Sequence, residues 1–120
     1  MKSRKEIMEI ISQANSTEHY HRISPIEGYP VITDGVLAVA EAAGAFWLLD
    51  LVCSHQCDER LCREFQVWKL EVDLEAQTGI VRGCNDDVVI VEQVIPYTDF
   101  PLEEFKLFLI DGVILLPREY

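Results

Sequence analysis

The sequence has few basic residues for its length. Ten lysines and arginines stand against 21 aspartates and glutamates among 120 residues, which leaves a formal net charge of −11 at pH 7. Affinity for a nucleic-acid backbone requires clustered lysine and arginine, so the shortage of basic residues argues against direct nucleic-acid binding. A strong negative charge keeps a small protein soluble, and it also attracts a partner whose surface is basic.

Long hydrophobic runs are also missing. The most apolar stretch, residues 36–49, contains Glu41 and is shorter than the roughly 20 apolar residues that a membrane span needs. Residues 1–14 carry charges throughout and lack the apolar core of a secretory signal. We therefore expect a cytoplasmic protein without membrane contact, in which the apolar stretch is a buried helix.

The composition is that of a folded domain. Apolar residues make up 49% of the chain and charged residues 26%, which is too apolar for a disordered segment. A length of 120 residues is close to the commonest domain size. We therefore expect residues 1–120 to fold around one hydrophobic core.

The first half of the chain has helical patterning interrupted by a connector. In residues 1–14, apolar residues recur at the i, i+3, i+4 and i+7 positions of an amphipathic helix: Ile7, Ile10, Ile11 and Ala14. Residues 15–32 hold prolines, a glycine and aromatic side chains without a sustained period, which predicts a long connector. Residues 33–56 begin with a capping Thr33 or Asp34 and are apolar on most sides, which predicts a central buried helix.

From residue 65 the pattern changes to a period of two. Residues 65–74 alternate between apolar and polar side chains as in a half-buried strand. Turn residues follow near Thr78 and Asp86, and Asp111-Gly112 between two apolar runs predicts a hairpin with a type I′ turn. Residues 65–120 should therefore form a mainly antiparallel sheet of about five strands, which makes the chain an α+β protein.

Several motifs resemble those of a family of small bacterial proteins that is classed as a domain of unknown function. They lie at residues 33–36 (TDGV), 43–50 (AGAFWLLD), 65–70 (FQVWKL), 95–102 (IPYTDFPL) and 111–120 (DGVILLPREY). The resemblance spans the chain from about Thr17 to Tyr120. It implies a single domain and a gene carried by phages, plasmids or other mobile elements, but it brings no activity or catalytic residue.

Acidic residues are concentrated in the sheet half of the chain. Between residues 71 and 111, ten acids stand against Arg82 and Lys106, which leaves −8 of the total −11. If these side chains share the open face or one edge of the sheet, they form a negative surface. The residues predicted to bind a partner are Glu71, Asp73, Asp86, Asp87, Glu92, Glu103 and Glu104.

Two further groups of residues could carry chemistry. His19, Tyr20, His21 and Arg22 in the connector could supply a general base and a cation. Cys53, Cys57 and Cys62, with His55 or Cys84, contain the thiolate and imidazole donors that zinc prefers. Cys53 and Cys57 are four residues apart on a predicted helix, and His55 would point away from both, so the spacing does not suit a structural zinc site.

The leading functional hypothesis is a non-enzymatic acidic module of a mobile element or phage. It would mask the basic, nucleic-acid-binding surface of a host nuclease or of a nucleoprotein immune complex, and it needs no cofactor. Two alternatives remain open from the sequence. One is a small enzyme that uses the connector around His19 and Arg22, and the other is a structural metal-binding module.

Overall fold

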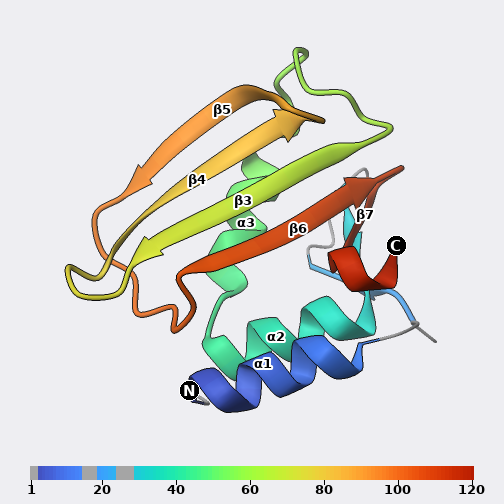
Figure 1. Ribbon diagram of the computed structural model, residues 1–120. Helices are drawn as coiled ribbons and strands as arrows, with labels where there is room; N and C mark the ends of the chain where they lie inside the picture. Colours follow the sequence, from blue (N-terminus) through green and yellow to red (C-terminus); the bar gives the residue numbers. More distant parts are fainter. Residues whose placement is uncertain (1–2, 15–18, 24–28) are drawn as a thin grey trace.

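A seven-stranded sheet with three α-helices on one of its faces makes up the part of the chain that the computed structural model describes, residues 3–14, 19–23 and 29–120 (Figure 1). In chain order the elements are α1 (Arg4–Gln13), β1 (His21–Arg22), β2 (Val31–Ile32), α2 (Asp34–Ala43), α3 (Phe46–Ser54), β3 (Gln66–Asp73), β4 (Thr78–Asn85), β5 (Val88–Ile95), β6 (Glu104–Ile110), β7 (Val113–Leu115) and a final 3₁₀ turn, η1 (Pro117–Glu119).

The strands lie in the order β1-β2-β7-β6-β3-β4-β5. Every neighbouring pair is antiparallel except β2 and β7, which are parallel, so the sheet is mixed and the predicted α+β class is confirmed. The prediction of about five strands was too low. Residues 65–120 do supply five strands, and the predicted connector supplies the other two.

The connector was predicted without strands because β1 and β2 contain only two residues each. A period of two cannot be recognised in so short a segment. His21 pairs with Ile32, and Val31 pairs in parallel with Val113 of β7. Contacts with a distant part of the chain therefore create these strands. Residues 15–18 and 24–28 of the predicted connector lie outside the described residues.

Helix α1 agrees with the amphipathic pattern. The Glu6 backbone N–H donates to the Ser3 hydroxyl (3.3 Å), and the Glu6 carboxylate accepts from the Ser3 backbone N–H, which completes a capping box. Ile7 is fully buried, and α1 lies along α2 on the side away from the sheet (Figure 1). In the described residues, no helix is both long and apolar enough to cross a membrane.

The predicted central helix is two helices. Gly44 adopts a left-handed conformation with φ of 62°, and the Ala45 N–H donates to the Ala40 carbonyl (2.9 Å). A left-handed glycine is a common helix end because it has no Cβ to clash. The chain therefore turns after α2 and starts α3 at Phe46, and both helices bury apolar residues against the sheet.

The core centres on Trp68 of β3, which is 2% exposed. Its indole N–H donates to Oε1 of the fully buried Gln66 (2.8 Å), and the Gln66 amide exchanges two hydrogen bonds of 2.9 Å with Gln56 after α3. The His55 ring stacks on the indole, with ring centroids 5.9 Å apart. The buried polar groups thus satisfy one another, and they attach the end of α3 to the sheet.

The Asp111-Gly112 hairpin between β6 and β7 forms as the sequence predicts. Asp111 has a φ of 49° and Gly112 a φ of 82°. A type I′ turn requires positive φ at both central residues, and Asp and Gly are among the residues that accept it. The turn places Leu109 opposite Ile114, and both are buried in the core.

Gly83 of β4 should be intolerant of any side chain. A Cβ at this position would stand 2.6 Å from Cη2 of Trp68. We expect Gly83→Ala to lower the free energy of unfolding by about 1–3 kcal/mol, because overpacking a filled core forces neighbours to move. The cost should shrink in a Trp68→Phe background, which lacks the outer indole ring. Urea unfolding of the two single variants and the double variant tests this, and equal costs in both backgrounds would contradict it.

Candidate binding surface

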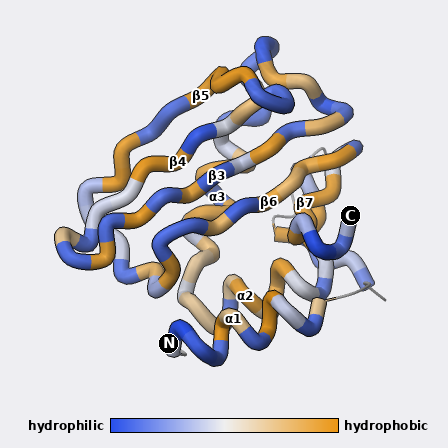
Figure 2. Tube along the Cα trace, viewed as in Figure 1, coloured by the Kyte–Doolittle hydropathy of each residue, from blue (hydrophilic) through white to orange (hydrophobic). Residues whose placement is uncertain are grey.

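The face of the sheet opposite the helices carries most of the charged strand residues. Along β3, Trp68, Leu70 and Val72 are buried against the helices, and the alternate positions from Lys69 to Asp73 lie on the other face. Figure 2 shows the resulting alternation of hydrophobic and hydrophilic residues along β3 and β6. We refer to this second face as the open face, because the helices lie on the opposite side of the sheet (Figure 1).

Cations occupy the middle of the open face. The strand register places Lys69 of β3 directly between Lys106 of β6 and Arg82 of β4. Arg82 Nε donates to Glu92 (2.9 Å) and Arg82 Nη1 donates to Glu71 (2.8 Å), and these two bonds raise the pKa of Arg82 above its usual value. Two of the seven predicted acidic residues therefore share one arginine, which offsets one of their two negative charges.

One end of the sheet gathers exposed carboxylates. The Val72 N–H donates to the Glu103 carbonyl (2.8 Å), and the Thr98 N–H donates to the Gln77 carbonyl (2.8 Å), which holds the β5–β6 loop against the end of β3 and the β3–β4 turn. Six exposed acidic residues meet there, and we call them the acidic end: Glu71, Asp73, Glu75, Asp99, Glu103 and Glu104. Among the described cations, Arg82 contacts Glu71 and Arg4 contacts Glu103 (3.4 Å).

A shallow hollow of about 420 Å³ lies where the acidic end meets the central cations. Lys69 stands opposite Lys106 on one side of it, and Glu71 stands opposite Glu104 on the other. The two rows have opposite charge and lie two residues apart along the strands. The period of two in the sequence predicts that Lys69 and Glu71 lie on the same face of the sheet. It does not predict that Lys106 and Glu104 of β6 stand opposite them, because that depends on the strand register.

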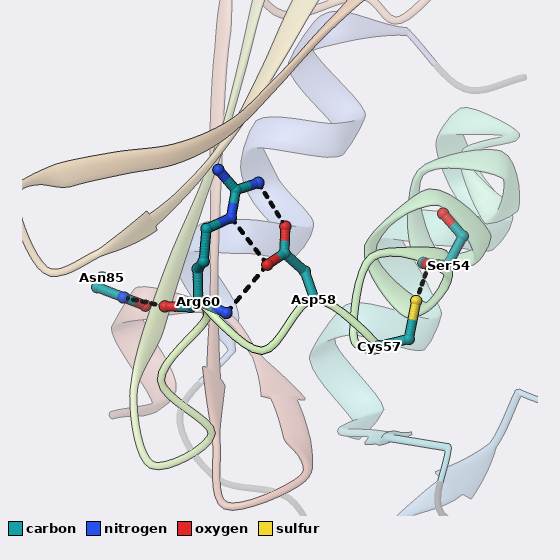
Figure 3. A network of polar contacts seen from close by, with 5 residues as sticks. All are labelled: Ser54, Cys57, Asp58, Arg60 and Asn85. Carbon is teal, nitrogen blue, oxygen red and sulfur yellow. Dashed lines mark hydrogen bonds and ion pairs between the residues drawn. The ribbon is translucent and has the colours of Figure 1, made fainter.

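Asp86 and Asp87 lie at the opposite end of the sheet, in the β4–β5 turn. Asn85, which precedes them, connects the turn to the loop after α3. Its Nδ2 donates to the Arg60 carbonyl (2.7 Å; Figure 3), and its Oδ1 accepts from the Cys62 N–H (2.7 Å). In the same loop the Arg60 guanidinium donates twice to Asp58, at 2.6 and 3.0 Å (Figure 3). These bonds lower the pKa of Asp58 to about 2.

The seven predicted partner-binding residues therefore do not form one continuous negative face. Glu71, Asp73, Glu103 and Glu104 belong to the acidic end. Asp86 and Asp87 are a strand length away, and Glu92 lies between the two groups with Arg82. The physical reason is that antiparallel strands send alternate turns to opposite ends of the sheet, and acidic residues concentrate in turns.

The connector residues separate into two places. His21 Nε2 lies 2.6 Å from Asp34 Oδ1 at the start of α2, and the His19 backbone N–H donates to Asp34 Oδ2 (3.4 Å). Tyr20 lines a hollow of about 280 Å³ beside Tyr120, whose lining includes neither histidine. Arg22 is exposed on β1. His21 and Asp34 thus form the kind of histidine–acid contact that a general base in an enzyme makes. Neither of them lines the hollow beside Tyr20 and Tyr120.

Glu119 joins the C-terminal turn to the start of α2, a contact that no sequence pattern indicates. Its Oε1 accepts from the Thr33 hydroxyl (2.7 Å) and from the Leu116 N–H (2.9 Å). Its Oε2 is buried without a hydrogen-bond partner among the described residues, beside Gly35. A carboxylate is favourable at the positive end of a helix. The two segments are 86 residues apart, so only the tertiary structure reveals the pair.

The cysteines do not assemble into a ligand set. Cys53 and Cys84 are buried, whereas Cys57 and Cys62 are exposed. The Cys57 thiol points back to the Ser54 carbonyl (3.6 Å; Figure 3), and His55 contacts Gln93 and Trp68. Within the described residues, no three His, Cys, Asp or Glu side chains come together as metal ligands would. Burial, with a smaller effect of Asp50, raises the pKa of the Cys53 thiol to about 11.

A comparison with protein families matches residues 5–120 to the Family of unknown function (DUF6876), so the chain belongs to that family. No curated protein matches the sequence, and no solved structure matches it. The family match covers the helices, the sheet and the acidic end together.

The four thiols should differ in reactivity. At pH 8 we expect two thiols of the folded protein, Cys57 and Cys62, to react with a colorimetric thiol reagent. Cys53 and Cys84 should react only after denaturation, because they are buried and the Cys53 thiol stays protonated below about pH 11. Mass spectrometry of the labelled peptides identifies the sites. Protection of Cys57 and Cys62 together with one bound zinc per chain would contradict this assignment.

Asp58 should titrate well below an ordinary aspartate. NMR titration of its carboxyl carbon should give a midpoint near pH 2. In Arg60→Gln the pKa should rise part of the way towards the usual 3.8, because the guanidinium bonds are lost while the backbone N–H of residue 60 still donates (3.0 Å). An Asp58 midpoint that is unchanged by Arg60→Gln would show that the pair does not form in solution.

Proposed function

We propose that this chain, as a member of the family of unknown function (DUF6876), is a non-enzymatic binding module that covers a basic surface of a partner protein. The observation that carries the proposal is the acidic end, where six exposed carboxylates from two turns and two strands lie together. Only Arg4 and Arg82 contact these carboxylates among the described cations, so most of the negative charge is available to a partner.

The location of the acidic end suits recognition by charge. Its carboxylates are exposed, and the backbone under them is held by strand pairing and by two bonds that join the β5–β6 loop to β3 and to the β3–β4 turn. A preformed charged surface steers an oppositely charged partner without paying an ordering cost on binding. The chain as a whole adds a long-range attraction through its net charge of −11.

The partner that fits this chemistry is a protein with a groove for nucleic acid. Such a groove is lined with lysine and arginine, and a rigid set of carboxylates competes with phosphates for it. In the mobile-element setting that the motifs suggest, the partner would be a host nuclease or a nucleoprotein immune complex. The module would act by occupying the groove, so it requires no cofactor and no catalytic residue.

A small enzyme is the second candidate, and one observation favours it. His21 and Asp34 make a contact of 2.6 Å, which is the geometry of a histidine oriented by an acid. Against it, the hollow beside Tyr20 is lined by neither histidine, so the pair does not face a substrate-sized space there. Replacing His21 with Asn should therefore leave partner binding unchanged, whereas it would abolish an activity built on the connector.

Charge reversal tests the proposal at defined positions. The variant Glu75→Lys, Asp99→Lys and Glu104→Lys should abolish binding to purified basic nucleases that the natural chain binds. It should stay folded, because all three side chains are exposed and none forms an ion pair among the described residues. Biolayer interferometry against a panel of such nucleases, with duplex DNA as competitor, provides the measurement.

The matched control carries the same charge change at the other end of the sheet. Glu59→Lys, Glu64→Lys and Asp87→Lys also move the net charge from −11 to −5, because each substitution replaces a negative charge with a positive one. The control should retain binding, with an association rate that falls steeply above roughly 0.15 M salt. If both triple variants bound equally well, or binding persisted unchanged at high salt, the acidic end would not be the contact surface.

A further inference from the structure

Among the described residues, the outer side of β5 is an unpaired sheet edge. β5 is the last strand in the sheet order and pairs with β4 on its inner side. Figure 1 shows the arrowhead half of β5 along the outline of the molecule, with no described element beyond it. The other edge strand, β1, contains only two residues. β5 with eight residues is therefore the one long edge of the described sheet.

This edge lacks most of the features that keep sheet edges apart. Residues 88–95 contain no lysine and no proline, and their single charged residue, Glu92, is bound to Arg82. Val88 is 62% exposed, Val89 50% and Val94 66%. Natural edge strands usually carry lysine, proline or inward charges that block pairing with another chain. β5 has only a bulge, because the register skips Ile90 between Val89 and Val91.

We propose that β5 pairs with β5 of a second copy of this chain, antiparallel and around a two-fold axis. The bulge limits regular pairing to residues 91–95, which have continuous register with β4. In the proposed register Gln93 stands opposite Gln93 of the second copy. Val91 then faces Ile95 of the other copy, and Glu92 faces Val94. The two sheets join into one sheet across the dimer.

The sequence of the edge selects this register over its neighbours. Side chains of directly paired residues must share a face, so the strands can shift only in steps that preserve the alternation. A shift one way places Glu92 opposite Glu92 of the second copy, and like charges directly opposite are destabilising. A shift the other way places Glu92 opposite Pro96, which has no N–H to donate. The proposed register avoids both and sets β-branched residues against each other.

Charge also permits the pairing. Antiparallel strands point the acidic ends of the two copies in opposite directions, away from the shared edge. The remaining repulsion between two chains of −11 is long-range and screened by salt. Dimer formation should therefore strengthen as salt is added. Binding to a basic partner should weaken as salt is added. The two associations therefore have opposite salt dependences, and one salt series distinguishes them.

Analytical ultracentrifugation of the full chain measures the assembly. From about 10 µM to about 0.5 mM protein at 0.5 M salt, the mass should rise from 13.7 kDa towards 27.4 kDa, twice the mass of one chain. The same series at 0.05 M salt should show less dimer. A monomer at every concentration in both salts would overturn the proposal.

Three single substitutions test the register. Val94→Asp places an acid opposite Glu92 of the other copy at two symmetric positions, so it should weaken the dimer by about tenfold or more. Val94→Lys, at the same exposed site, places a lysine opposite Glu92 and should keep or strengthen the dimer. Val88→Asp, an equally exposed valine beyond the bulge, should change dimerisation less than about twofold. A dimer unaffected by Val94→Asp, or lost equally with Val94→Lys, would overturn this interface.

A covalent trap locates the two-fold axis. In a Cys57→Ser and Cys62→Ser background, Gln93→Cys should form a disulfide-linked dimer under mild oxidation. Directly opposite residues of antiparallel strands have Cα atoms about 4.5–5.5 Å apart, which a disulfide spans. Val88→Cys in the same background should remain unlinked. Linkage through residue 88 but not residue 93 would overturn the proposed register.

Discussion

The contact between the Trp68 indole and Gly83 is the constraint on which the arrangement of the layers depends. Gly83 offers no side chain, so the indole lies directly over the β4 backbone. Gln66 and Gln56 then bond the end of α3 to β3, and His55 stacks on the same ring. One large side chain thus fixes the position of α3 on β3 and β4. β5, which lies next to β4, continues the sheet beyond this contact.

The covered face also determines what the open face can do. Since Trp68, Leu70 and Val72 must point to the helices, Lys69, Glu71 and Asp73 must point the other way. The acidic residues of the turns then collect at the two ends of the sheet, while Lys69, Lys106 and Arg82 occupy its centre. A protein with a net charge of −11 therefore has cations in the middle of its open face and a strongly negative end.

The proposed partner surface and the proposed dimer edge use different parts of the same sheet. The acidic end comprises the last residues of β3, the β3–β4 turn, the β5–β6 loop and the first residue of β6, whereas the dimer edge is the outer side of β5. In an antiparallel dimer both acidic ends stay exposed and point in opposite directions. A dimer of this kind would offer two separate contacts to basic partners, which raises avidity when both can be engaged.

Local chemistry determined the parts of the fold that the sequence predicted. The capping box of Ser3 and Glu6 begins α1, the alternation in residues 65–74 makes β3, and Asp111-Gly112 makes the last hairpin. Each depends on residues close in sequence, as does the capping of α2 by Thr33. The α+β class followed from these signals.

Only the tertiary structure decided how the pieces meet. The sequence pattern did not separate α2 from α3; the left-handed Gly44 divides them, and both helices bury apolar residues against the sheet. β1 and β2 exist because β7 offers a partner edge, and the predicted acidic face divided because strand register sends Asp86 and Glu103 to opposite ends. Side-chain alternation is a local property, but register depends on contacts between residues far apart in the chain, so no single segment encodes it.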